Sequence, residues 1–221
     1  GTLTQNKMTV THLWHGGHML EVTGEGYDPH GEILKDGKPL DLRKDQTLRR
    51  LLQISVLCNN AELVHHAETN KKKKGGEGPA QWQIKGDPTE GALIVLGAKA
   101  GMTASAMKGL YERVREFAFD SERKRMSVLV AHQGGRAVFV KGAPDLLLQR
   151  CKYILWDGKV LPLTDTLRHK VLAANEAMAR SALRVLGFAY RDVKESESCD
   201  DEEQAESGLI FVGLAGMIDP P

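Results

Sequence analysis

Apolar and polar positions alternate along much of the chain, which is the pattern of strands with one buried face. Gly16–Gly17 and Gly134–Gly135 each separate two runs of β-forming residues, so a tight hairpin is expected at both places. The run 209–218 is apolar throughout and predicts a strand buried on both faces. Strands are expected at 7–14, 18–23, 82–85, 114–119, 126–132, 137–141, 153–156, 185–193 and 209–218.

Helical periodicity alternates with these strands. Asp45 is a candidate N-cap for a helix that continues toward Leu63, and Pro88 with Glu90 in the first turn predicts a second helix that ends near Ala100. Further helices are expected at 104–111, 143–151 and 164–183. Loops are expected at 24–42, with or without a short strand, at 68–80, and at 195–206, with or without a short exposed helix. Hairpin strands interrupted by paired helices predict an α+β fold, with an antiparallel sheet flanked by helix pairs.

The composition is that of an ordinary globular protein: 221 residues, 41% hydrophobic and 27% charged, with a net charge of +1. This balance gives no electrostatic footprint for nucleic acid, and the lysine run 71–74 is interpreted as a solvated loop. Three cysteines without a CxxC pair favour reduced thiols in a cytosolic compartment. The apolar run 209–218 is too short to cross a bilayer, so the chain itself is not expected to span one.

The common catalytic and phosphate-binding motifs are absent from the sequence. There is no GxxxxGK[ST] loop, no kinase glycine-rich loop followed by His-Arg-Asp, and no arrangement that argues for a Ser-His-Asp triad. The histidine pairs 15/18 and 65/66 lack nearby cysteines and metal-binding helical spacing, so no metal site is expected.

Four positions carry chemistry suited to a nucleotide, although each also has an ordinary structural interpretation. Phe119 ends a strand before a basic turn and offers either a core side chain or a platform for an adenine ring. Lys141 ends another strand beside Gly142, which permits close backbone approach, and it is either an exposed strand-end lysine or a contact for a purine edge or phosphate. Glu90 either stabilises a helix N-terminus or accepts from an adenine amino group, and Arg184 is either a surface residue or a phosphate clamp.

Taken together, six segments resemble the nucleotide-binding domain of P-type cation-transporting ATPases over the whole chain. The segments are 1–9, Gly86-Asp87-Pro88-Thr89-Glu90, 119–127, Lys141-Gly142-Ala143, Arg184-Val185-Leu186 and Met217-Ile218-Asp219-Pro220-Pro221. In that order they resemble the residues that follow Asp-Lys-Thr in the phosphorylation motif, the helix start of the nucleotide domain, the adenine-stacking segment, the KGA motif, the arginine segment that faces the phosphates, and the DPP hinge. Within the family, the chain looks most like bacterial type II calcium pumps related to the reticulum calcium ATPase.

The resemblance implies a role for each matching residue. Phe119 would stack on adenine, Glu90 would bind its amino group, and Lys141 with Gly142 would line the pocket floor. Lys124 and Arg184 would lie toward the phosphates. Where animal pumps often carry an arginine two positions after the stacking phenylalanine, this chain has Ser121, so Arg123 or Lys124 is expected to take over that contact.

The resemblance also implies how the chain is organised and what it lacks. Residues 1–6 and 217–221 would be two hinge segments around a nucleotide-binding domain at 7–216, cut from a longer pump. ATP, as Mg-ATP, would be the ligand, with Mg²⁺ held mainly by a phosphorylation domain outside this chain. The partners would be the phosphorylation and actuator domains of the same pump, and the location the cytoplasmic side of a plasma-membrane protein.

Three functional hypotheses follow from these expectations. The first is an ATP-binding module of a cation pump, with calcium as the expected ion and sodium, proton or manganese as the alternatives, that binds but does not hydrolyse ATP on its own because the acceptor aspartate is missing. The second is a regulatory or interaction domain of the same fold that has lost nucleotide binding. The third is a stand-alone hydrolase or kinase, which would need metal-holding acids and an acceptor within the chain.

Overall fold

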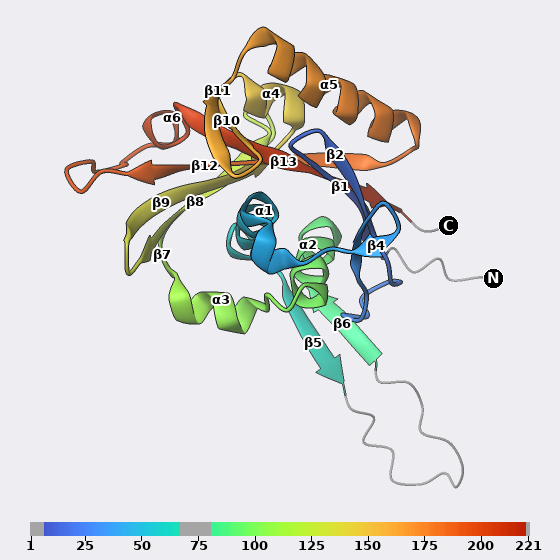
Figure 1. Cartoon of the computed structure of the whole chain (residues 1–221). Coiled ribbons are helices and arrows are strands. Elements are labelled where there is room, and N and C mark those ends of the chain that lie inside the picture. The colour runs from blue at the N-terminus through green and yellow to red at the C-terminus, as the bar shows by residue number, and fades with distance from the viewer. Residues whose placement is uncertain (1–6, 67–80, 220–221) are drawn as a thin grey trace, which may run out of the picture.

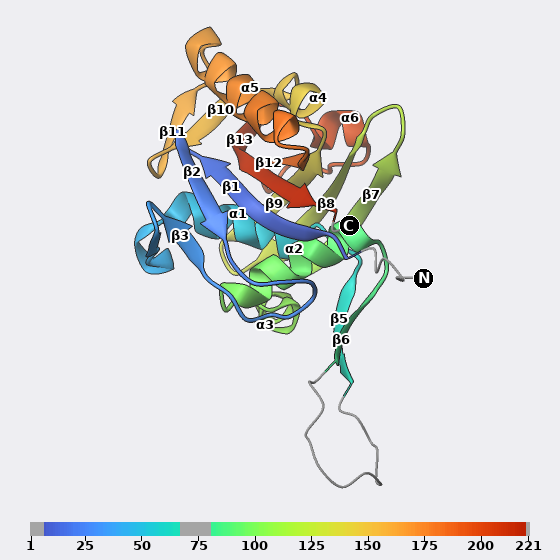
Figure 2. The same cartoon turned by 90° about the vertical axis from the view of Figure 1, so that its right-hand side faces the viewer.

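The computed structural model describes residues 7–66 and 81–219, and shows one large sheet with helices on both faces (Figure 1). In the described part of the chain the sheet has 11 strands, of which nine follow the order β4-β3-β2-β1-β13-β12-β9-β8-β7, and β10 joins through β13 with β11 beside it. A separate two-stranded hairpin, β5–β6, projects away from the body (Figure 2). The pairs are antiparallel except for β10 with β13, which is parallel.

The strands are β1 (Thr9–His15), β2 (His18–Val22), β3 (Ile33–Lys35), β4 (Lys38–Pro39), β5 (Glu62–His66), β6 (Gln81–Lys85), β7 (Glu112–Asp120), β8 (Arg125–His132), β9 (Gly135–Gly142), β10 (Cys151–Trp156), β11 (Lys159–Pro162), β12 (Arg184–Val193) and β13 (Leu209–Ile218). The helices are α1 (Gln46–Leu57), α2 (Pro88–Lys99), α3 (Ala104–Leu110), α4 (Pro144–Leu148), α5 (Asp165–Arg180), α6 (Glu202–Ala205) and the short 3-10 helix η1 (Leu42–Lys44).

Strand β13 organises the sheet, because it pairs with β1, β12 and β10. Its side chains alternate between two hydrophobic cores, as the two-residue period of a strand requires. Val212 belongs to the core under α1 and α2, whereas Phe211 belongs to the core under α4 and α5. The two helix pairs therefore cover opposite faces of the sheet (Figure 1), which confirms the predicted α+β class with an antiparallel sheet between helix pairs.

The hairpins and the helix N-caps that were predicted from short sequence segments are confirmed. Hairpins form at both predicted glycine pairs, with His15 opposite His18 and His132 opposite Gly135. Helix α2 begins at Pro88, with the Asp87 carboxylate accepting from the Thr89 and Glu90 amides at 2.8 and 3.1 Å. Asp45 caps α1 in the same way through the amide of Leu48.

Helix α1 ends earlier than the sequence pattern predicts. It stops at Leu57 instead of continuing toward Leu63, and strand β5 replaces its last expected turn. The reason is Asn59. Its side-chain nitrogen donates to the carbonyl oxygens of Ser55 and Glu90, and its side-chain oxygen accepts from the backbone amide of Ala61. These bonds turn the chain away from the helix and tie it to the start of α2.

The helix predicted at 143–151 is also shorter, since α4 ends at Leu148 and Cys151 begins β10. All three cysteines are free and buried, in line with the expected reduced thiols. Burial raises the pKa of the Cys58 thiol to about 11 and that of Cys151 to about 12, so both remain protonated near neutral pH.

The two ends of the described domain lie side by side. Thr9 in β1 pairs with Ile218 in β13, so the chain enters and leaves through adjacent strands (Figure 1). Strand β13 runs through Ile218, which places Met217 of the expected return segment inside the sheet. The expected hinge residues 1–6 and 220–221 lie outside the described residues. Within the described ranges, no helix has the length and apolar character needed to cross a membrane.

Candidate functional site

A pocket of about 620 Å³ opens between the N-terminus of α2 and the strands β7, β8, β9 and β12. All six residues that the sequence singled out for nucleotide contact line it, although they come from four elements and the β7–β8 turn. They are Glu90, Phe119, Lys124, Lys141, Gly142 and Arg184. Ser121, the position where an arginine is missing, lines the same pocket.

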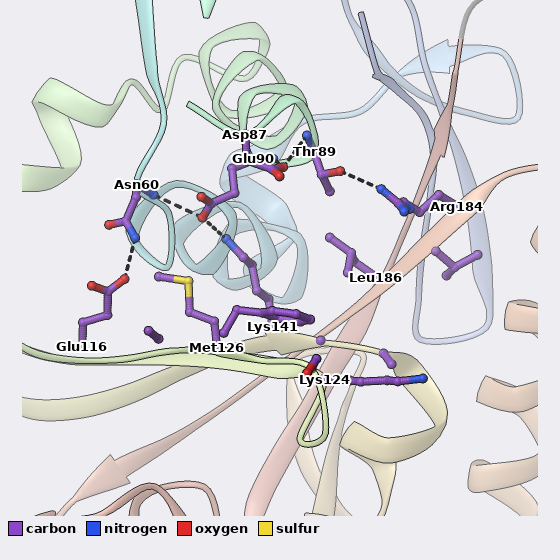
Figure 3. A pocket seen from close by; sticks show the side chains of 16 residues that line it. Asn60, Asp87, Thr89, Glu90, Glu116, Lys124, Met126, Lys141, Arg184 and Leu186 are labelled. Atoms are coloured by element: carbon purple, nitrogen blue, oxygen red, sulfur yellow. Dashed lines mark hydrogen bonds and ion pairs between the residues drawn. The ribbon is translucent and has the colours of Figure 1, made fainter. Parts of the chain in front are cut away.

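The floor of the pocket is an ion pair between Glu90 and Lys141. The Lys141 ammonium donates to the Glu90 carboxylate at 2.5 Å and to the carbonyl oxygen of Cys58 at 2.5 Å. The Glu90 carboxylate also accepts from the backbone amide of Asn60 at 3.2 Å. Lys141 is thus committed to protein partners, and its charge is balanced within the pocket (Figure 3).

One end of the pocket carries amide and carboxylate groups. The Asn60 side chain donates to Glu116 at 2.5 Å, and its oxygen accepts from Arg113. The Arg113 guanidinium also donates to the carbonyl oxygens of Leu57 and Asn59, at 2.7 Å each. This end is therefore pre-organised by the loop that follows α1.

The opposite end carries positive charge. Figure 3 shows Lys124 and Arg184 on the side of the pocket away from Asn60 and Glu116. Arg184 donates to the hydroxyl of Thr89 at 3.1 Å, which connects β12 to the first turn of α2. Among the described residues, the structure records no ion pair for Lys124.

Two residues shape the wall rather than supply a charge. Phe119 is 63% exposed, so it offers a surface that a ligand can cover and is not a core residue. Gly142 lets β9 approach the turn before β8, because a Cβ at this position would lie 2.6 Å from both the Lys124 carbonyl oxygen and the Arg125 Cβ. The Ala143 amide donates to the same Lys124 oxygen at 3.0 Å.

Arg123, which the sequence offered as a substitute for the missing arginine at position 121, is directed elsewhere. Its guanidinium donates to Glu206 and to the carbonyl oxygens of Phe117 and Ala118, and it does not line the pocket. Lys124 is the alternative that does.

Sequence reasoning missed several lining residues. Asp87 and Thr89 lie inside the Gly-Asp-Pro-Thr-Glu segment, so that motif already contained the signal for them. Asn60 and Glu116 are polar residues in unrelated segments, and only the tertiary structure brings them together. No local pattern distinguishes them from surface residues.

Comparison with known proteins gives a consistent assignment. Residues 47–221 match the family model described as P-type ATPase, cytoplasmic domain N. The whole chain is 39% identical to part of a calcium-transporting ATPase of Bacillus subtilis and 37% identical to part of the cation-transporting ATPase pma1 of Synechocystis, and it covers 24% and 23% of those proteins. It is also 33% identical to part of calcium-transporting ATPase type 2C member 1 of Bos taurus, of which it covers 21%. The chain therefore spans about a quarter of the length of these relatives, and it belongs to the P-type ATPase family as a cytoplasmic domain N.

Proposed function

We propose that this chain binds ATP in the pocket described above and serves as the nucleotide-binding domain of a cation pump. The observation that carries the proposal is the separation of chemistry along the pocket: hydrogen-bond acceptors lie at one end, and at the other lie two cationic side chains that form no ion pair with any described residue (Figure 3). A nucleotide has the same polarity, with amino and ring groups at its base and negative charge at its phosphates.

The adenine would lie against Phe119, Glu90 and Asn60, three of the residues that line the pocket. An exposed aromatic ring stacks on a base with about 1–3 kcal/mol of binding free energy. The Glu90 carboxylate, fixed by Lys141 and the Asn60 amide, is an acceptor for the exocyclic amino group. This end is pre-organised, so little conformational entropy is lost on binding.

The phosphates would lie toward Lys124 and Arg184. Arg184 can exchange its hydrogen bond with the Thr89 hydroxyl for charge-assisted bonds to a phosphate, which are stronger. Lys124 would supply the contact left open by Ser121, since Arg123 is occupied by Glu206.

In the whole pump, the domain would present the γ-phosphate to an aspartate of a neighbouring phosphorylation domain, with Mg²⁺ held mainly by that domain. The names of the relatives favour calcium as the transported ion. The actuator domain of the same pump would be a further partner, and the domain would lie on the cytoplasmic side of the plasma membrane. The adjacent ends of β1 and β13 suit a domain that is attached through two neighbouring hinge strands.

The test is a titration of the ¹⁵N-labelled chain with ATP, followed by NMR. One base stack and a few partly solvated charges support about −4 to −5 kcal/mol, so we expect a Kd near the millimolar range. Shifts should cluster at Glu90, Phe119, Lys141 and Arg184. Phe119→Ala should weaken binding by about 1–3 kcal/mol, whereas Tyr153→Ala, which truncates another exposed aromatic ring on β10, should leave it unchanged.

Two other results would redirect the assignment. If ATP caused no shifts up to about ten millimolar, the proposal would fail, and a regulatory domain that has lost its nucleotide would be the better interpretation. Release of phosphate by the isolated chain would instead support a stand-alone hydrolase, because an acceptor and a metal site would then have to lie within the chain.

A further inference from the structure

A second charged cluster lies behind the pocket wall, centred on Glu206. This residue directly follows α6, and its side chain is fully buried, with 0% exposed. Its carboxylate accepts from the Arg123 Nε at 3.1 and 3.0 Å, from the Arg125 Nε, and from the Ser127 hydroxyl at 2.8 Å. A buried carboxylate is stable only with such complete pairing, so the cluster acts as one unit.

The cluster and the pocket occupy opposite faces of β8. Met126 lines the pocket, and the next residue, Ser127, points to Glu206 on the other face, as the alternation of a strand requires. Helix α6 lies on the side of the sheet that carries α4 and α5 (Figures 1 and 2). Glu206 therefore does not contact the space in which a ligand would sit.

What Glu206 holds is the turn between β7 and β8, which carries Lys124. Arg123 and Arg125 flank Lys124 in sequence, and both are bound to Glu206. Arg123 also donates to the carbonyl oxygens of Phe117 and Ala118, at 3.2 and 3.0 Å. Lys124 itself has φ +51, a conformation that a non-glycine residue keeps only when its surroundings hold it.

Glu206 is itself anchored through its backbone. The Arg150 guanidinium donates to the carbonyl oxygens of Glu206 and Glu203, at 2.7 Å each, and Arg191 donates to that of Ala205 at 3.0 Å. These bonds fix the end of the acidic segment against the sheet. The segment is thus a docked support for the turn, although the sequence suggested only a loop or an exposed helix.

We propose that Glu206 is a positioning residue of the nucleotide site, which acts through Arg123 and Arg125 to place Lys124 at the phosphate end of the pocket. The proposal rests on the proposed function for the identity of the ligand. The positioning of the turn is a property of the chain alone and is measurable without nucleotide.

The first measurement is made without ATP. Lys124 donates its amide to the Asp120 carbonyl oxygen, and its own carbonyl oxygen accepts from the Ala143 amide. In Glu206→Gln, hydrogen exchange at these two amides should become faster while exchange at Leu13 and Ala215, paired in β1 and β13, is unchanged. The matched control is Glu203→Gln, which removes the same charge from an exposed side chain of the same segment and should change neither.

The second measurement is the Kd for ATP. Glu206→Gln should raise it about fivefold, since a charged contact to phosphate is misplaced, and Glu203→Gln should not. In a Lys124→Ala background, Glu206→Gln should add no further loss, because the two changes remove one interaction. Independent, additive losses would indicate a general structural role and would overturn the proposal.

The outcomes separate the two proposals. If the native chain bound no ATP, the proposed function would fail, and the exchange measurement would still decide whether Glu206 holds the turn. Unchanged exchange at Lys124 and Ala143 would refute the positioning role. Should Glu206→Gln not fold, the double variant Glu206→Gln/Arg125→Gln removes one of the uncompensated arginines, and the same amides are then read in that background against Arg125→Gln alone.

Discussion

Glu90 and Glu206 are two carboxylates that each bind cationic side chains, one on either face of the same sheet. Glu90 faces the pocket, where its side chain is 17% exposed and that of its partner Lys141 is 9% exposed. Glu206 is fully enclosed on the other face, and its partners Arg123 and Arg125 are 11% and 13% exposed. The two sites use the same chemistry but differ in their access to a ligand.

This difference decides what each carboxylate can do. A carboxylate that borders a cavity can accept an additional hydrogen bond from a ligand, because part of its surface is still open. A sealed carboxylate already has all its partners, and its charge is stable only while they remain. Glu90 is therefore suited to recognition, and Glu206 to holding the parts of the site in place.

The largest effect on stability is expected when each of the two carboxylates is removed in turn. Glu206→Ala should lower the free energy of unfolding by about 3–5 kcal/mol, because two arginines lose their buried counter-charge. Glu90→Ala should cost less, about 1–3 kcal/mol, since Lys141 keeps the Cys58 carbonyl oxygen and gains water from the pocket. Urea denaturation of both variants measures the two losses, and equal values would contradict the distinction.

A smaller effect is expected from Gly142, which lies where the pocket wall meets the turn that Glu206 supports. Gly142→Ala should destabilise the chain by about 1–3 kcal/mol, because the added Cβ would overlap the Lys124 carbonyl oxygen and Arg125.

Gly109→Ala is the matched control for Gly142→Ala. Gly109 lies in α3, and a Cβ there meets nothing within 4 Å, so the variant should be about 0.5–1 kcal/mol more stable. Thermal unfolding should show that Gly142→Ala is less stable than the native chain and that Gly109→Ala is more stable. A neutral Gly142→Ala would show that the turn can move away from β9.

The smallest effect concerns the exposed end of the same turn. The Asp120 carboxylate accepts from the amides of Arg123 and Glu122, at 3.2 and 2.7 Å, and these bonds lower its pKa. The turn is thus stabilised above the unfolded pKa of about 3.9, and this contribution is lost as the pH falls through the lower folded value. The amide shifts of Glu122 and Arg123 should titrate with a midpoint below about 3.9.

Asp120→Asn provides the control for this pH dependence, since its side-chain oxygen can accept the same bonds without a titration. The shifts at Glu122 and Arg123 should then be constant over the same range. A midpoint in the native chain at or above about 3.9 would mean that the amides do not stabilise the charged form.

Part of the candidate site could be predicted from the sequence because its members lie in short segments that, taken together, resemble a known family. The start of α2 follows from Asp87 and Pro88, and the pocket residues of that helix come with it. Phe119 and Lys141 were recognisable as strand-end residues next to a turn and a glycine. Their common pocket was expected only from the resemblance of the segments taken together, and the structure places them on one cavity.

Other features had no local signal. Asn59 ends α1 through bonds to Ser55 and to Glu90, the latter 31 positions away, so helical periodicity alone extended that helix too far. Glu206 stands in a run of acidic residues that resembles a solvated loop, yet it is buried against side chains about 80 positions earlier.

The sequence by itself determined most of the strands, the hairpins at the two glycine pairs and the starts of α1 and α2, because each depends on neighbours within a few positions, but it predicted neither β5 nor β11. Only the tertiary structure decided which charged side chains are accessible to a ligand and which are buried in ion pairs, since burial depends on segments that meet after the chain has folded. Lys124 is available and Arg123 is not, although they are adjacent in one basic turn. The physical reason is that a side chain's partners, not its type, determine whether its charge is free to bind a ligand.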